Sequence, residues 1–232
     1  MTKTKGPHSG ARNLAARLKT AEGRTTSSQR WLNRQLNDPF VLAAKAQGYR
    51  SRAAFKLLQM HERYRLFKPG LRVLDLGAAP GGWSQVAARL VRAGEKSGGK
   101  VVAVDIQEMA PLGDVAVMLE DFLAEGAETR IKAVLGGLAD AVLSDMAEPA
   151  TGHRQTDHMR IMAMADTAAI FAEEILAPGG FFLCKVLQGG SEKDLLNLLK
   201  RAFSAVKHVK PEASRADSAE LYVLATGFRG RV

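Results

Sequence analysis

Short apolar runs alternate with helical patterns along the chain from residue 72 onward. The seven runs that are typical of strands lie at 72–76, 101–105, 115–120, 141–145, 181–186, 205–209 and 221–226. The apolar spacing between them predicts helices at about 84–92, 124–135, 157–176 and 192–203. This alternation indicates an α/β protein with a doubly wound, mostly parallel sheet that is covered by helices on both faces.

The last two apolar runs are joined differently from the others. The residues between them carry too little helical pattern to form the crossover that joins two parallel strands. We therefore expect the final strand to be antiparallel. The sequence thus predicts a Rossmann-like sheet of seven strands whose last strand runs against its neighbours.

Two further helices are expected before the sheet. Asp38, which precedes a proline, is suited to begin the first, and Ser51 is suited to cap a second that runs to about residue 64. On the second helix, Phe55 and Leu58 form the expected core face, whereas Lys56 lies off that face.

The first 30 residues differ in composition from the rest of the chain. They are rich in Gly, Ser, Thr and basic groups and hold only short apolar stretches, which is typical of disorder. We therefore predict a basic, disordered arm at 1–30 and one domain at 31–232. Within that domain, we expect basic helices at 31–68 and the Rossmann-like core at 71–228.

Composition excludes several classes of protein. With 232 residues and 46% hydrophobic content, the chain can bury a full core. No apolar run approaches the roughly 20 residues that a membrane span needs, and the N-terminal region lacks the apolar core of a secretory signal. We therefore expect no membrane partner and a cytoplasmic location.

Positive charge is concentrated at one end of the chain. Residues 1–68 hold 15 Lys and Arg against three Asp and Glu, a net charge of +12, although the whole chain carries only +9. Such an excess is expected of a segment that binds a polyanion, and a solubilising tail is the alternative. Charge alone does not distinguish RNA from DNA or from an acidic membrane.

A glycine-rich turn follows the first predicted strand, at the place where doubly wound folds bind their ligands. Gly77, Gly81 and Gly82 permit tight turning and a close approach of the backbone to a ligand, and Trp83 ends the turn. A dinucleotide site would need a second glycine where Ala79 stands. S-adenosylmethionine has no pyrophosphate to anchor, so we predict that this turn binds S-adenosylmethionine.

Two acidic residues follow the next two predicted strands. Asp105 ends the second strand. Its spacing along the sequence from the glycine-rich turn is close to that of the carboxylate that binds ribose hydroxyls in nucleoside-binding folds, and Asp121 follows the third strand. Acidic residues at strand ends are also ordinary turn formers. Because both lie in register with the glycine-rich turn, we favour cofactor binding for both.

Lys185 interrupts an apolar run that is otherwise typical of a strand buried on both faces. A lysine at such a position needs a partner or a chemical role. Asp145 ends the preceding strand, and neighbouring strands lie ~4.8 Å apart, so these two side chains can meet. Glu220 opens the last strand and could also lie near Lys185. A purely structural buried ion pair is the alternative.

Five motifs together resemble one known family. They begin at Gly48 (GYRSRAAFKL), Asp75 (DLGAAPGGW), Ser144 (SDMA), Lys185 (KVLQG) and Ser218 (SAELYVLATG). In this order, over about residues 31–228, they resemble the FtsJ/RrmJ ribosomal RNA 2′-O-ribose methyltransferases. The chain departs from the family's usual Pro-Asn after SDMA, because Glu148 and Pro149 stand there, which concerns the rim of the substrate site.

The resemblance implies roles for individual residues. Lys56, Asp145, Lys185 and Glu220 fall on the family's catalytic set. The positions that fall on its cofactor contacts are Gly81, Trp83, Asp105, Asp121 and Asp145. The resemblance also implies a uridine of large-subunit (23S) ribosomal RNA as the substrate, with ribosomal RNA or the large ribosomal subunit as the partner.

The reaction expected from these residues is a direct displacement in which a ribose 2′ oxygen attacks a sulfonium methyl group. In our hypothesis, Lys185 contacts that oxygen, either accepting its proton or stabilising its developing charge. Asp145 and Glu220 orient the amine, and Lys56 adds a second cation.

No metal is expected. His153 and His158 lie on different sides of a helix and no carboxylate completes a site, and the single Cys184 is expected to be a small core residue. Three alternative functions remain: a transfer-RNA ribose methyltransferase of the same fold, a non-catalytic RNA-binding assembly factor, and a small-molecule methyltransferase. We expect a monomer.

Overall fold

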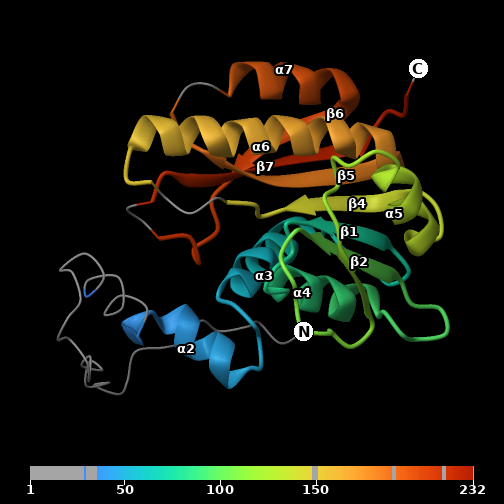
Figure 1. Ribbon diagram of the computed structural model, residues 1–232, viewed down its shortest axis with the longest axis horizontal. Helices are drawn as coiled ribbons and strands as arrows, with labels where there is room; N and C mark the ends of the chain where they lie inside the picture. Colours follow the sequence, from blue (N-terminus) through green and yellow to red (C-terminus); the bar gives the residue numbers. More distant parts are fainter. Residues whose placement is uncertain (1–28, 30–35, 148–150, 190–191, 216–217, 232) are drawn as a thin grey trace.

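A computed structural model describes residues 29, 36–147, 151–189, 192–215 and 218–231 of the chain. Its centre is one seven-stranded sheet in the order β3-β2-β1-β4-β5-β7-β6 (Figure 1). The strands are β1 (Arg72–Leu76), β2 (Lys100–Asp105), β3 (Val115–Leu119), β4 (Ala139–Ser144), β5 (Leu176–Leu187), β6 (Phe203–Val209) and β7 (Glu220–Phe228). The predicted arm at 1–30 lies outside the described residues, except for Gln29.

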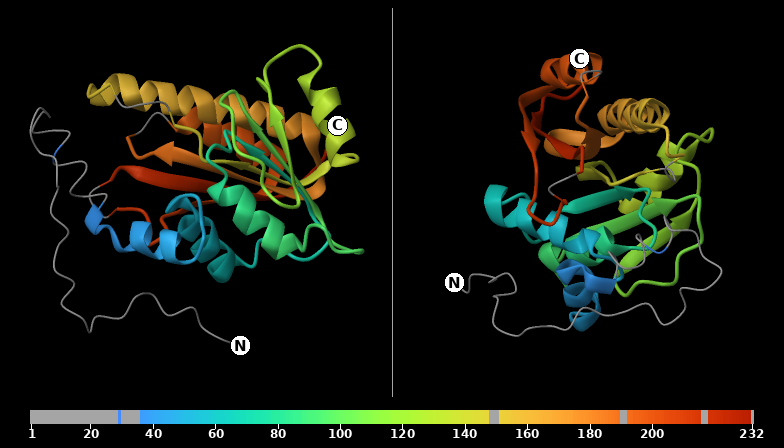
Figure 2. Two further views of the ribbon diagram at one scale, coloured as in Figure 1. Left: turned by 60° about the horizontal axis from the view of Figure 1, so that its bottom comes forward. Right: turned by 90° about the vertical axis from the view of Figure 1, so that its left-hand side faces the viewer.

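Helices cover both faces of the sheet, as the alternating pattern predicts (Figure 2). They are α2 (Pro39–Ala46), α3 (Ala53–Tyr64), α4 (Gly82–Val91), α5 (Ala127–Leu135), α6 (Arg154–Ile175) and α7 (Lys193–Ala202). Apolar side chains of α5, α6 and α7 form one core with the sheet, and those of α3 and α4 form a second core on the opposite face.

The antiparallel final strand is confirmed. β7 lies between β5 and β6 and pairs antiparallel with both, whereas β1 to β5 are parallel to one another. The predicted bounds differ most at β5, which begins at Leu176 instead of residue 181. Pro178, Gly179 and Gly180 favour a turn, but here they bulge between two stretches that both pair with β4.

The helices before the sheet correct two expectations. Asp38 does cap α2, because its side chain accepts a hydrogen bond from the Phe40 amide at 3.0 Å. Ser51 does not cap α3, which begins at Ala53 with Arg52 as the N-cap and no side-chain cap bond. The expected faces of α3 are also wrong: Phe55 and Leu58 are only half-buried, whereas Lys56 is buried.

Ser51 instead packs against the start of α4. A Cβ added at Gly82 would overlap the Ser51 hydroxyl oxygen, so a larger residue there would require the Ser51 side chain or the two helices to shift. We expect Gly82→Ala to lower the free energy of unfolding by about 1–3 kcal/mol, the usual cost of overpacking. Removing the hydroxyl in the double variant Ser51→Ala/Gly82→Ala should restore most of this loss, as urea denaturation would measure. Additive losses in the double variant would contradict this packing.

Candidate active site

Parallel pairing brings two predicted catalytic residues level with each other at the carboxyl edge of the sheet. Ser144 of β4 pairs with Cys184 of β5, so Asp145 and Lys185 are the next residues along the two chains. The Lys185 Nζ lies 2.7 Å from Asp145 Oδ1 and donates a hydrogen bond to the Asp145 backbone carbonyl at 2.8 Å. The side chains of Asp145 and Lys185 are therefore in contact, as predicted.

A second ion pair lies beside the first. The Lys56 Nζ, from α3, is 2.8 Å from the carboxylate of Glu220 and 4.0 Å from Asp145 Oδ2. Both lysines are buried, each with 8% of its surface exposed. The four predicted catalytic residues thus form one cluster, in which Asp145 lies between the two amines.

The partner of Glu220 differs from our hypothesis. Glu220 contacts Lys56 and accepts a hydrogen bond from the Ser214 hydroxyl at 2.7 Å, so it orients Lys56 directly. Burial favours a higher pKa for Glu220, but the charge and hydrogen bond of Lys56, with smaller effects of Lys185 and Ser214, hold this pKa below its usual value. Glu220 is therefore a carboxylate at neutral pH.

Tyr222 is the neighbour that the sequence did not single out. Its hydroxyl donates a hydrogen bond to Asp145 Oδ1 at 2.8 Å, and its ring lies beside Trp83 and Lys56. Burial, followed by the charges of Asp145 and Glu220, raises the pKa of Tyr222 well above its usual value. The hydroxyl therefore stays protonated and can hold Asp145 in place.

The glycine-rich turn adopts the conformation that its glycines permit. Gly77 and Gly81 have φ angles of +65° and +103°, in the region that favours glycine. The amides of Gly77 and Ala78 both donate to the Val104 carbonyl, which ties the turn to β2. A Cβ at Gly77 would also overlap the Met146 side chain, so a larger residue there would require Met146 to move.

The other predicted cofactor residues lie on both sides of this turn. Asp105 ends β2 and accepts hydrogen bonds from the amides of Ala79 and Gln107, both at 2.8 Å. Asp121 follows β3 and is exposed. Trp83 is buried, and its indole nitrogen donates to the Ala53 carbonyl at 2.8 Å, so Trp83 packs α4 on α3. Carboxylates at the carboxyl edge suit the hydroxyl groups of a nucleoside, so Asp105 and Asp121 are compatible with such a group, whereas the described contacts of Trp83 are packing contacts.

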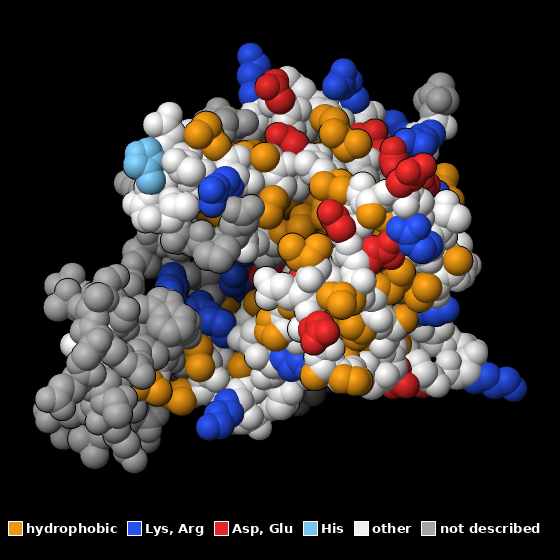
Figure 3. Space-filling model, viewed as in Figure 1, with side chains coloured by type: hydrophobic (Ala, Val, Ile, Leu, Met, Phe, Trp, Pro, Cys, Tyr) orange, Lys and Arg blue, Asp and Glu red, His pale blue; other side chains and the backbone are white. Residues whose placement is uncertain are grey.

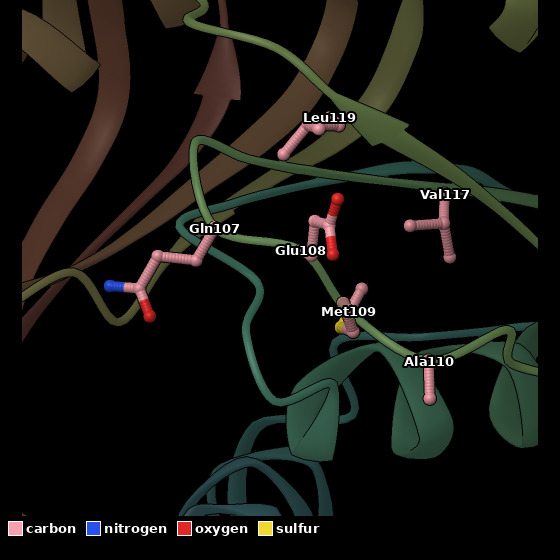
Figure 4. A pocket seen from close by; sticks show the side chains of 6 residues that line it. All are labelled: Gln107, Glu108, Met109, Ala110, Val117 and Leu119. Carbon is pink, nitrogen blue, oxygen red and sulfur yellow. The ribbon is translucent and has the colours of Figure 1, made fainter.

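A separate hollow of about 410 Å³ lies farther along this edge, between the loop after β2 and strand β3 (Figure 4). Its lining residues are Gln107, Glu108, Met109, Ala110, Val117 and Leu119. None of them belongs to the four-residue cluster or to the predicted cofactor set.

Asp75 of β1 is a buried acidic residue outside the four-residue cluster. It accepts a hydrogen bond from the Ser84 hydroxyl at 2.6 Å, and both side chains are buried. Burial raises the pKa of Asp75 to about 7, opposed by the Ser84 hydrogen bond and reinforced by the charges of Asp145 and Asp105. The carboxyl group is therefore protonated in the folded protein over a range of pH in which it is ionised in the unfolded chain.

This difference predicts how stability depends on pH. The unfolded chain releases the Asp75 proton near pH 3.8 and the folded protein near pH 7, so the free energy of unfolding should fall between these values as pH rises. The fall is at most about 1.4 kcal/mol per pH unit. Asp75→Asn removes this titration, so its stability relative to wild type should rise from pH 5 to pH 7 in urea denaturation. A constant difference would contradict the assignment.

Within the described ranges, no group of three or more His, Cys, Asp or Glu side chains could hold a metal ion. No helix in the described part of the chain is long and apolar enough to cross a membrane. Burial raises the pKa of the Cys184 thiol to about 12, which agrees with its interpretation as a core residue.

Comparison with known proteins identifies one family. The sequence matches the FtsJ-like methyltransferases over residues 49–228, a range that contains all the predicted site residues. The protein is 59% identical to "Ribosomal RNA large subunit methyltransferase E" of Parvibaculum lavamentivorans, over 98% of this chain and 92% of that protein. It is also 59% identical to the protein of the same name from Xanthobacter autotrophicus, over 99% of this chain and 89% of that one.

A solved structure shares the fold. A Plasmodium falciparum protein described as a ribosomal RNA methyltransferase is similar with a TM-score of 0.69 and 28% identity. The similarity covers 79% of this chain and the whole of that one.

Proposed function

The chain belongs to the FtsJ-like methyltransferase family, and on that basis we propose that it transfers a methyl group from S-adenosylmethionine to the ribose 2′ oxygen of a uridine in large-subunit ribosomal RNA. The observation that carries this proposal is the cluster of two buried lysines and two carboxylates at the carboxyl edge of the sheet. The cluster holds an amine in a fixed orientation, and a hydroxyl nucleophile needs such a group to accept its proton or to stabilise its charge.

Lys185 acts on the nucleophile. Its Nζ contacts the ribose 2′ oxygen and either accepts the proton or stabilises the negative charge that develops as the new bond forms. Asp145 holds this amine from one side at 2.7 Å, and the Tyr222 hydroxyl holds Asp145 in turn. Because Lys185 is buried, little water competes for its donors.

Lys56 supplies the second cation of the site. Glu220 fixes its amine at 2.8 Å, and Ser214 fixes Glu220. In this arrangement the positive charge of Lys56 stabilises negative charge that develops near the reacting oxygen. Each lysine thus has its own carboxylate.

The residues of the glycine-rich turn fit the proposed cofactor. When bound, S-adenosylmethionine supplies a methyl group activated by its sulfonium. We assign its binding to Gly77, Gly81, Gly82, Trp83, Asp105, Asp121 and Asp145. The strongest support is the positive φ of Gly77 and Gly81, because these glycines let the backbone approach a ligand closely, with the Asp105 carboxylate at the next strand end.

Ribosomal RNA is the substrate that best accounts for the charge of the chain and for the names of its relatives. The net charge of +12 in residues 1–68 suits a polyanion. The relatives that share 59% identity are both named as large-subunit ribosomal RNA methyltransferases. We further propose that the protein works in the cytoplasm, as a monomer, without a metal ion.

Methyl transfer to several RNAs in parallel tests this function. Labelled S-adenosylmethionine would be supplied with intact large subunits, protein-free large-subunit ribosomal RNA or transfer RNA, and the product nucleoside identified by mass spectrometry. We expect 2′-O-methyluridine in large-subunit RNA. Label in transfer RNA alone would identify a transfer-RNA enzyme of the same fold, and the absence of label from every RNA would favour a non-catalytic assembly factor.

A further inference from the structure

Asp38 holds together three segments near the site. It is buried, with 9% of its surface exposed, and its Oδ1 caps α2 through the Phe40 amide. Its Oδ2 forms an ion pair with Arg52 and lies 3.4 Å from the Nη2 of Arg215. One carboxylate thus joins the start of α2, the start of α3 and the loop between β6 and β7.

The two arginines line a pocket beside the catalytic cluster. This pocket measures about 200 Å³ and is lined by Arg52, Lys56, Arg215, Ser218 and Glu220. Figure 3 shows Lys and Arg side chains gathered in a hollow near α3. Because Lys56 and Glu220 belong to both the pocket and the cluster, a group bound in the pocket would lie next to the reacting ribose.

The guanidinium of Arg52 is held on two sides but is not fully satisfied. It donates to Asp38 and to the Ala213 carbonyl. Its Nε is buried and has no hydrogen-bond partner among the described residues. The side chains of Arg52 and Arg215 keep 17% and 34% of their surface exposed, so an oxygen ligand in the pocket can reach both of them.

We propose that Asp38 is a positioning residue that holds Arg52 and Arg215 so that they receive a phosphate of the RNA chain beside the Lys56–Glu220 pair. The proposal rests on the proposed function, because it assumes an RNA substrate. Guanidinium groups match phosphate oxygens in a bidentate geometry, and phosphate contacts fix the register of a nucleic acid on a protein. A fixed pair of arginines therefore places the neighbouring ribose at Lys185.

The sign of the effect of Asp38 on RNA binding separates this role from simple electrostatics. Removing the negative charge of Asp38 makes the site more positive, so charge alone predicts tighter RNA binding. Positioning predicts weaker binding, because both arginines lose their common anchor. If Asp38 served only as a helix cap, replacement by asparagine would change nothing, since asparagine caps helices equally well.

Asp38→Asn is the decisive variant because it keeps the cap and removes the charge. We expect KM and Kd for RNA to rise about tenfold, the effect of losing one charge-assisted contact, with kcat and the Kd for S-adenosylmethionine changed less than about twofold. The dependence of log Kd on log salt concentration should become shallower by about one unit. Asp38→Glu, which keeps the charge, should recover part of the affinity.

Asp140→Asn is the matched control. Asp140 also binds a backbone amide and an arginine, both of Arg72, but it lies in β4 near the start of the strand, at the opposite edge of the sheet. Its replacement should leave RNA binding unchanged.

Two results would overturn the role of Asp38: unchanged or tighter RNA binding by Asp38→Asn, or a lower melting temperature as its only effect. Failure of the wild-type protein to methylate any RNA would count against the proposed function instead, and the direct RNA Kd of the two proteins would still test Asp38.

Discussion

Lys185→Ala is expected to slow methyl transfer to RNA by about a thousandfold or more, with the Kd for S-adenosylmethionine within about threefold of wild type. The amine of Lys185 is buried and held by both the carboxylate and the carbonyl of Asp145, so no other group can replace it at the same place. Lys56 is committed to Glu220 on the other side of Asp145. The loss should therefore appear in kcat, because Lys185 is not among the residues that we assign to cofactor binding.

Lys185→Met is the control for packing, since methionine fills much of the same volume without a charge. Lys185→Met should be as inactive as Lys185→Ala, and its free energy of unfolding should be at least as high as that of Lys185→Ala. Single-turnover transfer of labelled methyl groups and calorimetric titration with S-adenosylmethionine measure the two quantities. Transfer within about tenfold of wild type by either variant, with cofactor binding intact, would show that Lys185 is only half of a structural ion pair.

Asp145→Ala is expected to affect folding and activity together. It removes the partner of one buried lysine and the acceptor of the Tyr222 hydroxyl, so the free energy of unfolding should fall by about 3 kcal/mol. Methyl transfer should fall at least as far as in Lys185→Ala, because the amine loses its orientation.

The double variant Asp145→Leu/Lys185→Met separates these effects. Replacing both partners of a buried ion pair by apolar groups is often neutral for stability, so the double variant should regain most of the lost stability. It should remain inactive. Urea denaturation and methyl transfer on the same preparations would check this. Recovery of activity along with stability would show that the charges act only through folding.

The Lys185–Asp145 pair could be predicted because the positions of both residues along the sequence indicate that their side chains lie close together. A lysine in an apolar strand needs a partner, and parallel pairing places the end of the preceding strand beside it. Family membership was likewise evident from five motifs in order. The fold class was predictable for the same reason, since helices and strands alternate with clear periods.

The Lys56–Glu220 pair could not be derived in the same way. Its geometry depends on how α3 lies over the sheet, and the apolar pattern of α3 placed Lys56 on the wrong face. The buried lysine is tolerated only because β7, 164 residues later, supplies a carboxylate. The role of Tyr222 could not be predicted for a related reason. Tyrosine is common in strands, and only the hydrogen bond to Asp145 distinguishes this one.

The insertion of β7 between β5 and β6 has a consequence for how the enzyme becomes active as it folds. Until β7 enters the sheet, β6 has no strand beside it, Lys56 has no carboxylate from Glu220, and Asp145 lacks the Tyr222 hydroxyl. During synthesis on a ribosome, this strand emerges after every other strand of the sheet. A nascent chain that has already formed the glycine-rich turn would therefore remain inactive until β7 completes the sheet.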